Sequence, residues 1–161
     1  MAKLVTLVSV LVLLAACSGG GASATPGRTA GASATAAGAG ETVKLADTTL
    51  GKVLVGSNGK TLYGFTPDKD QGKPTCYDAC AATWPPLTVS GDFTVGTGLD
   101  KSKFKLVDRT DGSKMLQIGD YPLYFYAPDV NAGDVNGQGV GGKWFVVGAD
   151  GTLIQTTASP S

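Results

Sequence analysis

One phrase of the sequence occurs twice, and this repetition limits the architectures that the chain can adopt. TLYGFTPD at residues 61–68 returns as PLYFYAPD at residues 122–129. The likeness continues into the following loop, where Gly72 is matched by Gly133. The shared Tyr-x4-Asp motif consists of Tyr63 and Asp68 in the first copy and of Tyr124 and Asp129 in the second. We therefore predict two related units, pseudo-repeats at residues 50–90 and 104–154.

Short apolar runs that alternate with turn residues predict β-hairpins. Asn-Gly and Asp-Gly pairs tolerate the positive φ that tight turns need, and here they lie between β-prone runs. The three expected turns are Ser57–Lys60, Arg109–Gly112 and Gly148–Gly151. No amphipathic helical stretch separates these hairpins. The expected fold class is therefore all-β, a small antiparallel sandwich or irregular barrel built from two related hairpin units.

One short helix is expected near residues 76–83, within PTCYDACAATWPP. Thr75 is a suitable N-cap, and Asp78 falls in the first turn, where the helix dipole favours a negative charge. Pro85 would end the helix. All twelve aromatic residues lie in the region of hairpins, so we predict a single β domain over residues 41–157 and a disordered tail at 158–161.

The first seventeen residues carry a signal for export. Lys3 precedes an apolar run of 13 residues, Leu4–Ala16, which is too short to span a bilayer core about 30 Å thick. The ending Leu14-Ala15-Ala16-Cys17 resembles the lipobox of bacterial lipoproteins. We therefore expect a lipoprotein signal peptide at residues 1–16 and acylation of Cys17 with fatty chains such as palmitate. An ordinary signal peptide with a chance cysteine is the alternative.

Residues 17–40 begin with the lipidated cysteine and continue as a Gly/Ala/Ser/Thr segment with no large apolar side chain. Such a composition has nothing to bury and predicts a flexible tether. Two or more acyl chains anchor a protein stably to a membrane. The expected location is the extracytoplasmic face of the cell membrane, or the outer membrane in a host with two, since Ser18 is not the aspartate linked to inner-membrane retention.

Charge and composition exclude several classes of function. The 13 basic residues match the 13 acidic ones, so a nucleic-acid partner is not indicated. The chain contains no histidine, which removes the usual general base and the imidazole metal ligand. We therefore expect neither an enzyme nor a bound cofactor.

Two interpretations of the Tyr-x4-Asp motif remain open at this point. In the first, the aromatic rings pack the core while the aspartates accept hydrogen bonds from loop amides. In the second, Tyr63 and Tyr124 belong to a ligand-binding face. Asp68 and Asp70 also resemble the acid pair of a sugar hydrolase, but carboxylates beside a flexible loop are usually solvated.

Cys76 and Cys80 form the most chemically suggestive pair in the domain. Export favours a disulfide, because disulfides persist outside the cytoplasm, and residues four apart on a helical turn come within bridging distance. A structural bridge is the preferred interpretation. A reactive dithiol is an alternative, as is a soft-metal site completed by Met115.

The loop that follows the second motif is rich in side-chain oxygens. Its weak calcium candidates are Asp129, Asn131, Asp134 and Asn136. Their order does not fit an EF-hand, because Gly133 precedes Asp134 and Val140 stands where the bidentate glutamate belongs. Asx turns explain the same residues, so no metal is expected.

Several blocks in order resemble the bacterial secreted-repeat lipoproteins, a family with a repeated Tyr-x4-Asp motif. These blocks are GKVLVGSNGKTLYGFTPD, CYDACAATWPPL and GDYPLYFYAPDVNAGDVNGQGVGGKWFVV, and the resemblance extends over residues 50–154. It implies an exported, lipid-anchored domain of two related units with no established activity. Some relatives have a histidine where this chain has Phe145, so metal chemistry that depends on that position would be absent here.

Two functional hypotheses follow. The first is a lipid-anchored, non-enzymatic binding module that contacts an envelope or extracellular protein through exposed aromatic edges. The alternative is an envelope redox or metal-handling protein that uses Cys76 and Cys80.

Overall fold

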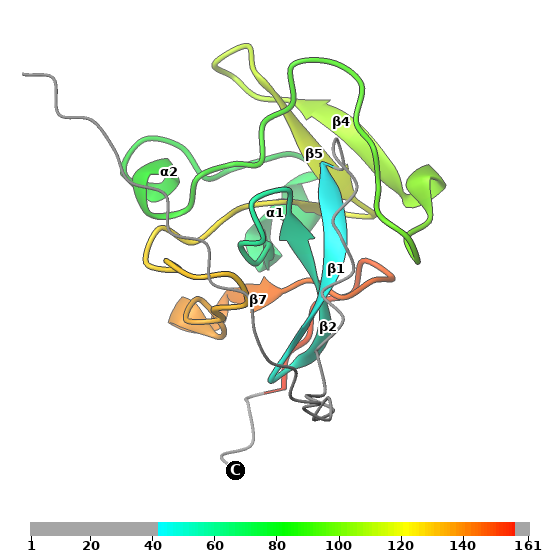
Figure 1. The fold of residues 1–161 in the computed structure, drawn as a ribbon. Coiled ribbons are helices and arrows are strands. Elements are labelled where there is room, and N and C mark those ends of the chain that lie inside the picture. Colours follow the sequence, from blue (N-terminus) through cyan, green and yellow to red (C-terminus); the bar gives the residue numbers. More distant parts are fainter. Residues whose placement is uncertain (1–41, 157–161) are drawn as a thin grey trace, which may run out of the picture. The chain divides into compact units, whose positions relative to one another are not determined.

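The computed structural model describes residues 42–156 (Figure 1). The predicted signal peptide, Cys17, the tether and the C-terminal tail lie outside the described residues. The strands are β1 (Val43–Thr48), β2 (Gly51–Gly56), β3 (Tyr63–Phe65), β4 (Phe104–Asp108), β5 (Lys114–Ile118), β6 (Tyr121–Pro122) and β7 (Trp144–Val146). The helices are α1 (Thr66–Gln71), α2 (Ala79–Thr83) and two 3-10 turns, η1 (Lys101–Lys103) and η2 (Val140–Gly142).

The strands form three small antiparallel sheets, which confirms the all-β prediction. Their orders are β1-β2, β3-β7 and β4-β5-β6. Within residues 42–156 the sheets do not close into a barrel, so the sandwich alternative describes the fold. In Figure 1, β4 and β5 lie at the top of the view, β1 lies at the centre, and β2 and β7 lie in the lower part. None of the described helices is long and apolar enough to cross a membrane.

The predicted hairpins are present to different extents. The β4–β5 hairpin forms as expected around Arg109–Gly112. The hairpin around Gly148–Gly151 forms a short ladder next to its turn, with Val147 bridged to Leu153. The arms around Ser57–Lys60 pair only next to their turn, because the chain beyond it pairs with β7 instead. The sequence did not predict the β1–β2 hairpin.

The helical prediction needs two corrections. α2 begins at Ala79 and not at residue 76, because Asp78 has a left-handed φ of 52° that no α-helix accommodates. Thr75 is not its N-cap, since its hydroxyl donates to Asp68 instead. The sequence also missed α1, although Pro67 at its start and the left-handed Gly72 after its end are typical helix boundaries.

A reciprocal pair of backbone hydrogen bonds joins the two repeats at their centre. The N–H of Tyr63 donates to the carbonyl of Tyr124 at 2.8 Å, and the N–H of Tyr124 donates to the carbonyl of Tyr63 at 2.9 Å. The two tyrosines occupy the same position in their repeats. The pair therefore lies on an approximate two-fold axis that relates one repeat to the other.

Each repeat also gives its last extended segment to the other repeat. β7 of the second repeat pairs with β3 of the first, and the N–H of Thr66 donates to the carbonyl of Lys143 at 2.9 Å. In the equivalent place, the N–H of Ala127 donates to the carbonyl of Thr83 at 2.9 Å. Neither repeat therefore completes its backbone pairing without the other.

The alternation of side chains along the central strands divides the core into two clusters, each supplied by both repeats. The first cluster contains Val43, Leu54, Leu62 and Leu87 with Phe104, Leu116, Ile118, Leu123 and Val147. The second contains Val53, Val55, Tyr63, Cys76 and Trp84 with Met115, Tyr124, Trp144 and Val146. The aromatic residues of the motif thus pack in the second cluster, which also contains one of the cysteines.

Candidate functional site

The two Tyr-x4-Asp motifs exchange their hydrogen bonds. The hydroxyl of Tyr63 donates to Asp129 at 2.7 Å, and the hydroxyl of Tyr124 donates to Asp68 at 2.7 Å. Each tyrosine therefore bonds the aspartate of the other repeat and not the one five positions after it in the chain. All four side chains are fully buried. The motif thus joins the two repeats from both sides.

The second carboxylate oxygen of each aspartate holds the loop that follows it. Asp68 accepts the backbone N–H of Thr75 at 2.9 Å, and Asp129 accepts that of Asn136 at 3.1 Å. This geometry confirms the interpretation in which the rings pack the core and the aspartates accept loop amides. The expectation that Asp68 is solvated is wrong, because these bonds draw it inside.

The prediction of an exposed aromatic edge at the motif is also wrong. Tyr63 and Tyr124 are 0 % exposed, because their hydroxyls must reach the buried aspartates. These rings cannot touch a partner in the folded protein. The contact surface of a binding module would have to lie elsewhere.

A pair of stacked tryptophans extends the same symmetric core. The rings of Trp84 and Trp144 are parallel within 1°, with centroids 3.8 Å apart. Each also meets the motif tyrosine of its own repeat edge-on, at 5.4 Å from Tyr63 and 5.2 Å from Tyr124 respectively. Gly137 leaves room for this packing, because a Cβ there would lie 2.8 Å from Trp84 and 2.9 Å from Tyr63.

Burial changes the acidity of the crossed pairs. Loss of water around the side chain raises the pKa of Asp68 and of Asp129 above the usual aspartate range, although the hydrogen bonds that they accept act in the opposite direction. Burial, together with the bond to an aspartate, likewise raises the pKa of both tyrosine hydroxyls. The tyrosines therefore act as hydrogen-bond donors at neutral pH.

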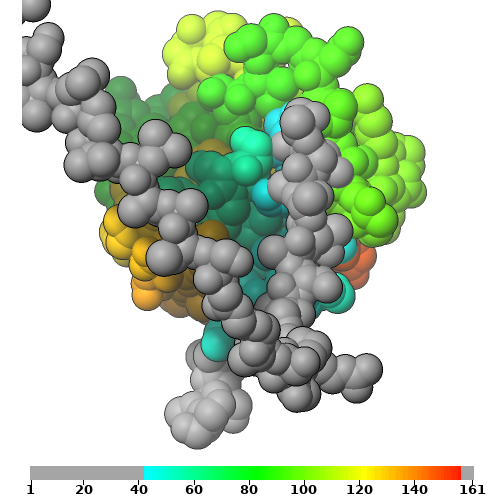
Figure 2. Space-filling model, in the orientation of Figure 1, coloured from blue at the N-terminus to red at the C-terminus, as the bar shows by residue number. Residues whose placement is uncertain are grey.

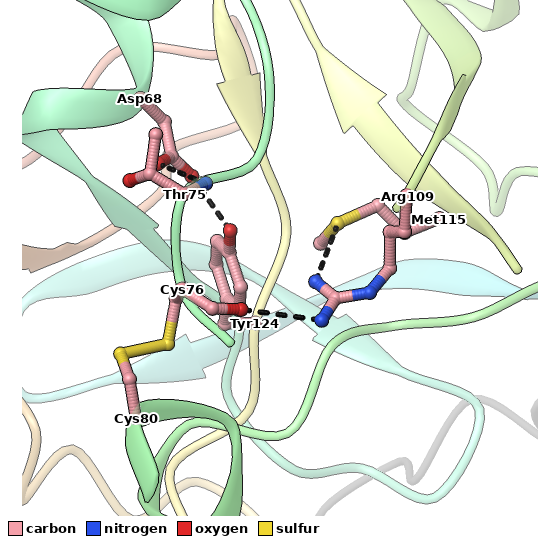
Figure 3. Close-up of a disulfide and its surroundings, with 7 residues drawn as sticks. All are labelled: Asp68, Thr75, Cys76, Cys80, Arg109, Met115 and Tyr124. Atoms are coloured by element: carbon pink, nitrogen blue, oxygen red, sulfur yellow. Dashed lines mark hydrogen bonds between the residues drawn. A yellow bond between two sulfur atoms is a disulfide. The ribbon is translucent and has the colours of Figure 1, made fainter. Parts of the chain in front are cut away.

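The cysteine pair forms the predicted disulfide on the loop that Asp68 holds (Figure 3). Arg109, only 5 % exposed, reaches this loop from the β4–β5 turn. Its Nη2 donates to the carbonyl of Cys76 at 3.2 Å, and its guanidinium lies 4.3 Å from the ring centre of Tyr77. Its Nε donates to Asp111 at 3.2 Å. The buried cation thus fastens the disulfide loop to the second repeat.

Met115, the third ligand of the soft-metal hypothesis, packs in the same cluster but contacts the guanidinium. Its Sδ accepts the Arg109 Nη1–H at 3.7 Å, and Figure 3 shows the sulfur directed toward that group. The two cysteine sulfurs are bonded to each other. In this oxidised state the three sulfurs do not form a thiolate site.

The oxygen-rich loop is held by its own amides, as the Asx-turn interpretation predicted. Asp134 accepts the N–H of Val130 at 3.0 Å and of Asn131 at 2.8 Å. Asp129 is buried, and Asn136 contributes its N–H to it. Among residues 42–156 no group of three His, Cys, Asp or Glu side chains is placed to hold a metal ion.

An open groove of about 700 Å³ lies on the face of the β4–β5 hairpin. Leu106 and Val89 give it an apolar surface, and Asp92 and Lys114 add opposite charges. Figure 2 shows the two segments that border it, residues 88–92 and the β4–β5 turn, side by side at the upper edge of the view. The sequence did not predict this groove.

The sequence also missed Arg109 and the tryptophan pair. Arg109 was assigned only to a hairpin turn, and nothing local distinguishes a buried turn arginine from a solvated one. Trp84 and Trp144 are 60 positions apart, one fewer than the offset of the motif. An alignment of the repeats with a one-residue gap would have paired them.

A model of the protein family described as a secreted repeat of unknown function matches the chain twice. The matches cover residues 44–88 and 105–148, more than half of the 161 residues. Each match includes one Tyr-x4-Asp motif and the loop after it. No curated protein and no solved structure matches the chain.

The crossed pairing predicts a specific pattern of energetic coupling. In a double-mutant cycle, we expect Tyr124→Phe and Asp68→Asn to couple by about 1–2 kcal/mol, because a hydrogen bond to a buried charged group is worth about 1.5–3 kcal/mol. Tyr124→Phe and Asp129→Asn should couple by less than about 0.5 kcal/mol. Urea denaturation of the three single variants, the two double variants and the wild type measures both values. Stronger coupling within one repeat than across repeats would contradict the pairing.

The raised carboxylate pKa values predict how stability depends on pH. Between the ordinary aspartate pKa and the raised value, the folded protein binds more protons than the unfolded chain. The unfolding free energy contributed by Asp68 is therefore fully present at low pH and falls as the pH rises through the folded-state pKa. We expect the wild type to lose stability as the pH rises above the ordinary aspartate pKa of about 3.9, and Asp68→Asn to lose less, measured by urea denaturation at a series of pH values. The exposed Asp92→Asn is the control and should keep the decline; an unchanged slope in Asp68→Asn would contradict the assignment.

Proposed function

Because the chain belongs to the family of secreted repeats of unknown function, we propose that it is an exported, lipid-anchored module of the cell envelope that binds another protein and carries out no reaction on it. The family description supports export. The Leu14-Ala15-Ala16-Cys17 sequence supports an acyl anchor at Cys17. Residues 17–40 would then act as the tether between the anchor and the β domain.

One observation carries the proposal of a binding role. The side chains that the two repeats share, their motif tyrosines and aspartates, are buried and paired within the core. These side chains build the fold and are inaccessible to a substrate. A function of the domain must then use its surface, where the groove on the β4–β5 hairpin is open to solvent.

The hairpin and its groove have features that suit the binding of an extended segment of another protein. β4 is the edge strand of its sheet, and an edge strand can pair with a segment of another chain. In the groove, which lies across the face of the hairpin, Leu106 provides an apolar contact, while Ser90 and Lys114 provide donors. A partner segment of mixed polar and apolar character would suit this lining. We assign the contact to this groove in place of the buried tyrosines.

Filling the groove should abolish binding without unfolding the domain. Ser90 lies exposed in the groove, and we expect Ser90→Trp to reduce recovery of the partner by at least about tenfold, measured by quantitative mass spectrometry after mild crosslinking on intact cells. Ser57→Trp, on an exposed turn outside the groove, is the matched control. Failure of the wild type to recover a specific partner, or equal recovery by both variants, would contradict the proposal.

The anchor is tested separately. Intact mass of the protein isolated from its own host should show Cys17 as the N-terminal residue carrying acyl chains. We expect Cys17→Ser to move the protein from the membrane fraction to the medium, as seen by immunoblot, because no acyl chain then holds it. Cys76→Ser should leave the protein in the membrane fraction. An unmodified Cys17 in wild-type protein free in the medium would refute the anchor.

A further inference from the structure

We propose that the Cys76–Cys80 disulfide is a reversible thiol–disulfide exchange site, at which a thiol reductant attacks Cys80 while the fold remains intact. This activity goes beyond the proposed binding role and does not depend on it. It rests on a comparison within the molecule, between the loop that carries the disulfide and the equivalent loop of the other repeat.

The second repeat builds the same loop without a disulfide. Gly137 and Gly141 stand 61 positions after Cys76 and Cys80. Asp129 nevertheless holds the backbone N–H of Asn136, as Asp68 holds that of Thr75. The covalent bond is therefore not what gives the loop its conformation.

The turn that follows matches its counterpart only in part. Asp78 and Gly139 both have a positive φ, of 52° and 75°, but their ψ angles, −125° and 5°, differ. A short helical element comes next in each repeat, α2 in the first and η2 in the second. A stacked tryptophan completes each loop. The two loops thus share a positive-φ residue, a helical element and a core tryptophan, and differ in ψ at the turn between them.

Contacts that do not involve sulfur also hold the disulfide loop itself. The N–H of Cys76 faces the hydroxyl of Tyr124, as the N–H of Gly137 donates to the hydroxyl of Tyr63 at 3.2 Å. Arg109 binds the carbonyl of Cys76 at 3.2 Å, as Figure 3 shows. These bonds remain when the disulfide opens, so reduction should leave the loop in place.

Access distinguishes the two sulfurs. Cys76 is 1 % exposed, whereas Cys80 is partly exposed. Cys80 packs against the second core cluster, and its neighbours on α2 are the small residues Ala79, Ala81 and Ala82, whose side chains end at Cβ. In Figure 1, α2 lies at the side of the view, away from the labelled strands. An attacking thiolate therefore reaches Cys80 first.

The exchange balances as two thiol steps. A thiolate, such as that of glutathione, attacks Sγ of Cys80; the Cys76–Cys80 bond breaks, a mixed disulfide forms on Cys80, and Cys76 leaves as a thiolate that takes a proton from water. A second glutathione thiolate then attacks the glutathione sulfur, releasing glutathione disulfide and the Cys80 thiolate, which is protonated in turn.

The test uses full-length protein with Cys17→Ser, so that Cys76 and Cys80 are its only cysteines. The oxidised protein is equilibrated in glutathione buffers of increasing reduced fraction, quenched with iodoacetamide and mapped by peptide mass spectrometry. We expect reduction to reach half within this series, with the mixed disulfide on Cys80. A disulfide that stays closed in a thousandfold excess of reduced glutathione, or an adduct on Cys76, would overturn the proposal.

Two further measurements separate an exchange site from a structural bridge. The near-ultraviolet circular dichroism of the stacked tryptophans should persist after reduction, and its loss would show that the bridge is structural and overturn the proposal. In single variants, the thiol of Cys80 in Cys76→Ser should react with Ellman's reagent at least about tenfold faster than the thiol of Cys76 in Cys80→Ser, because of its exposure. Equal rates would contradict the assignment of Cys80 as the attacked sulfur.

Discussion

The exchange of hydrogen bonds between the repeats is the constraint on which the rest of the structure depends. Each motif tyrosine reaches the aspartate of the other repeat, and that aspartate fixes the loop that carries a core tryptophan. Each repeat also supplies the last extended segment that its neighbour needs. The two units are therefore halves of one cooperative structure, with both hydrophobic clusters assembled from residues of each.

The differences between the two repeats indicate which residues serve a purpose other than maintaining the shared fold. The first repeat has a disulfide where the second has Gly137 and Gly141. The second repeat supplies Arg109, which lies against the disulfide loop, and the hairpin face that forms the groove. The motif pairs and the stacked tryptophans, found in both repeats, are buried. Among the features found in only one repeat, the groove is open and Cys80 is partly exposed, whereas Arg109 and Cys76 are buried.

The sequence predicted local structure well and long-range partners poorly. Gly112 and Gly151 adopt the positive φ that their turns need, and this local requirement is why the sequence predicts these two hairpins correctly. The repeated phrase predicts the duplication. The partner of Tyr63 lies 66 positions away, and no local pattern shows whether a tyrosine bonds its own aspartate or that of the other copy. The same reason explains why Asp68 was expected in solvent and Arg109 was treated as an ordinary turn residue.

The segment between the repeats, residues 91–103, connects the two halves covalently, and the halves are also held together by backbone hydrogen bonds, crossed side-chain bonds and a common core. A protease that cut the chain in this segment would leave two fragments that stay associated through these contacts. The cut protein would keep its fold, and the cut would become visible only after denaturation.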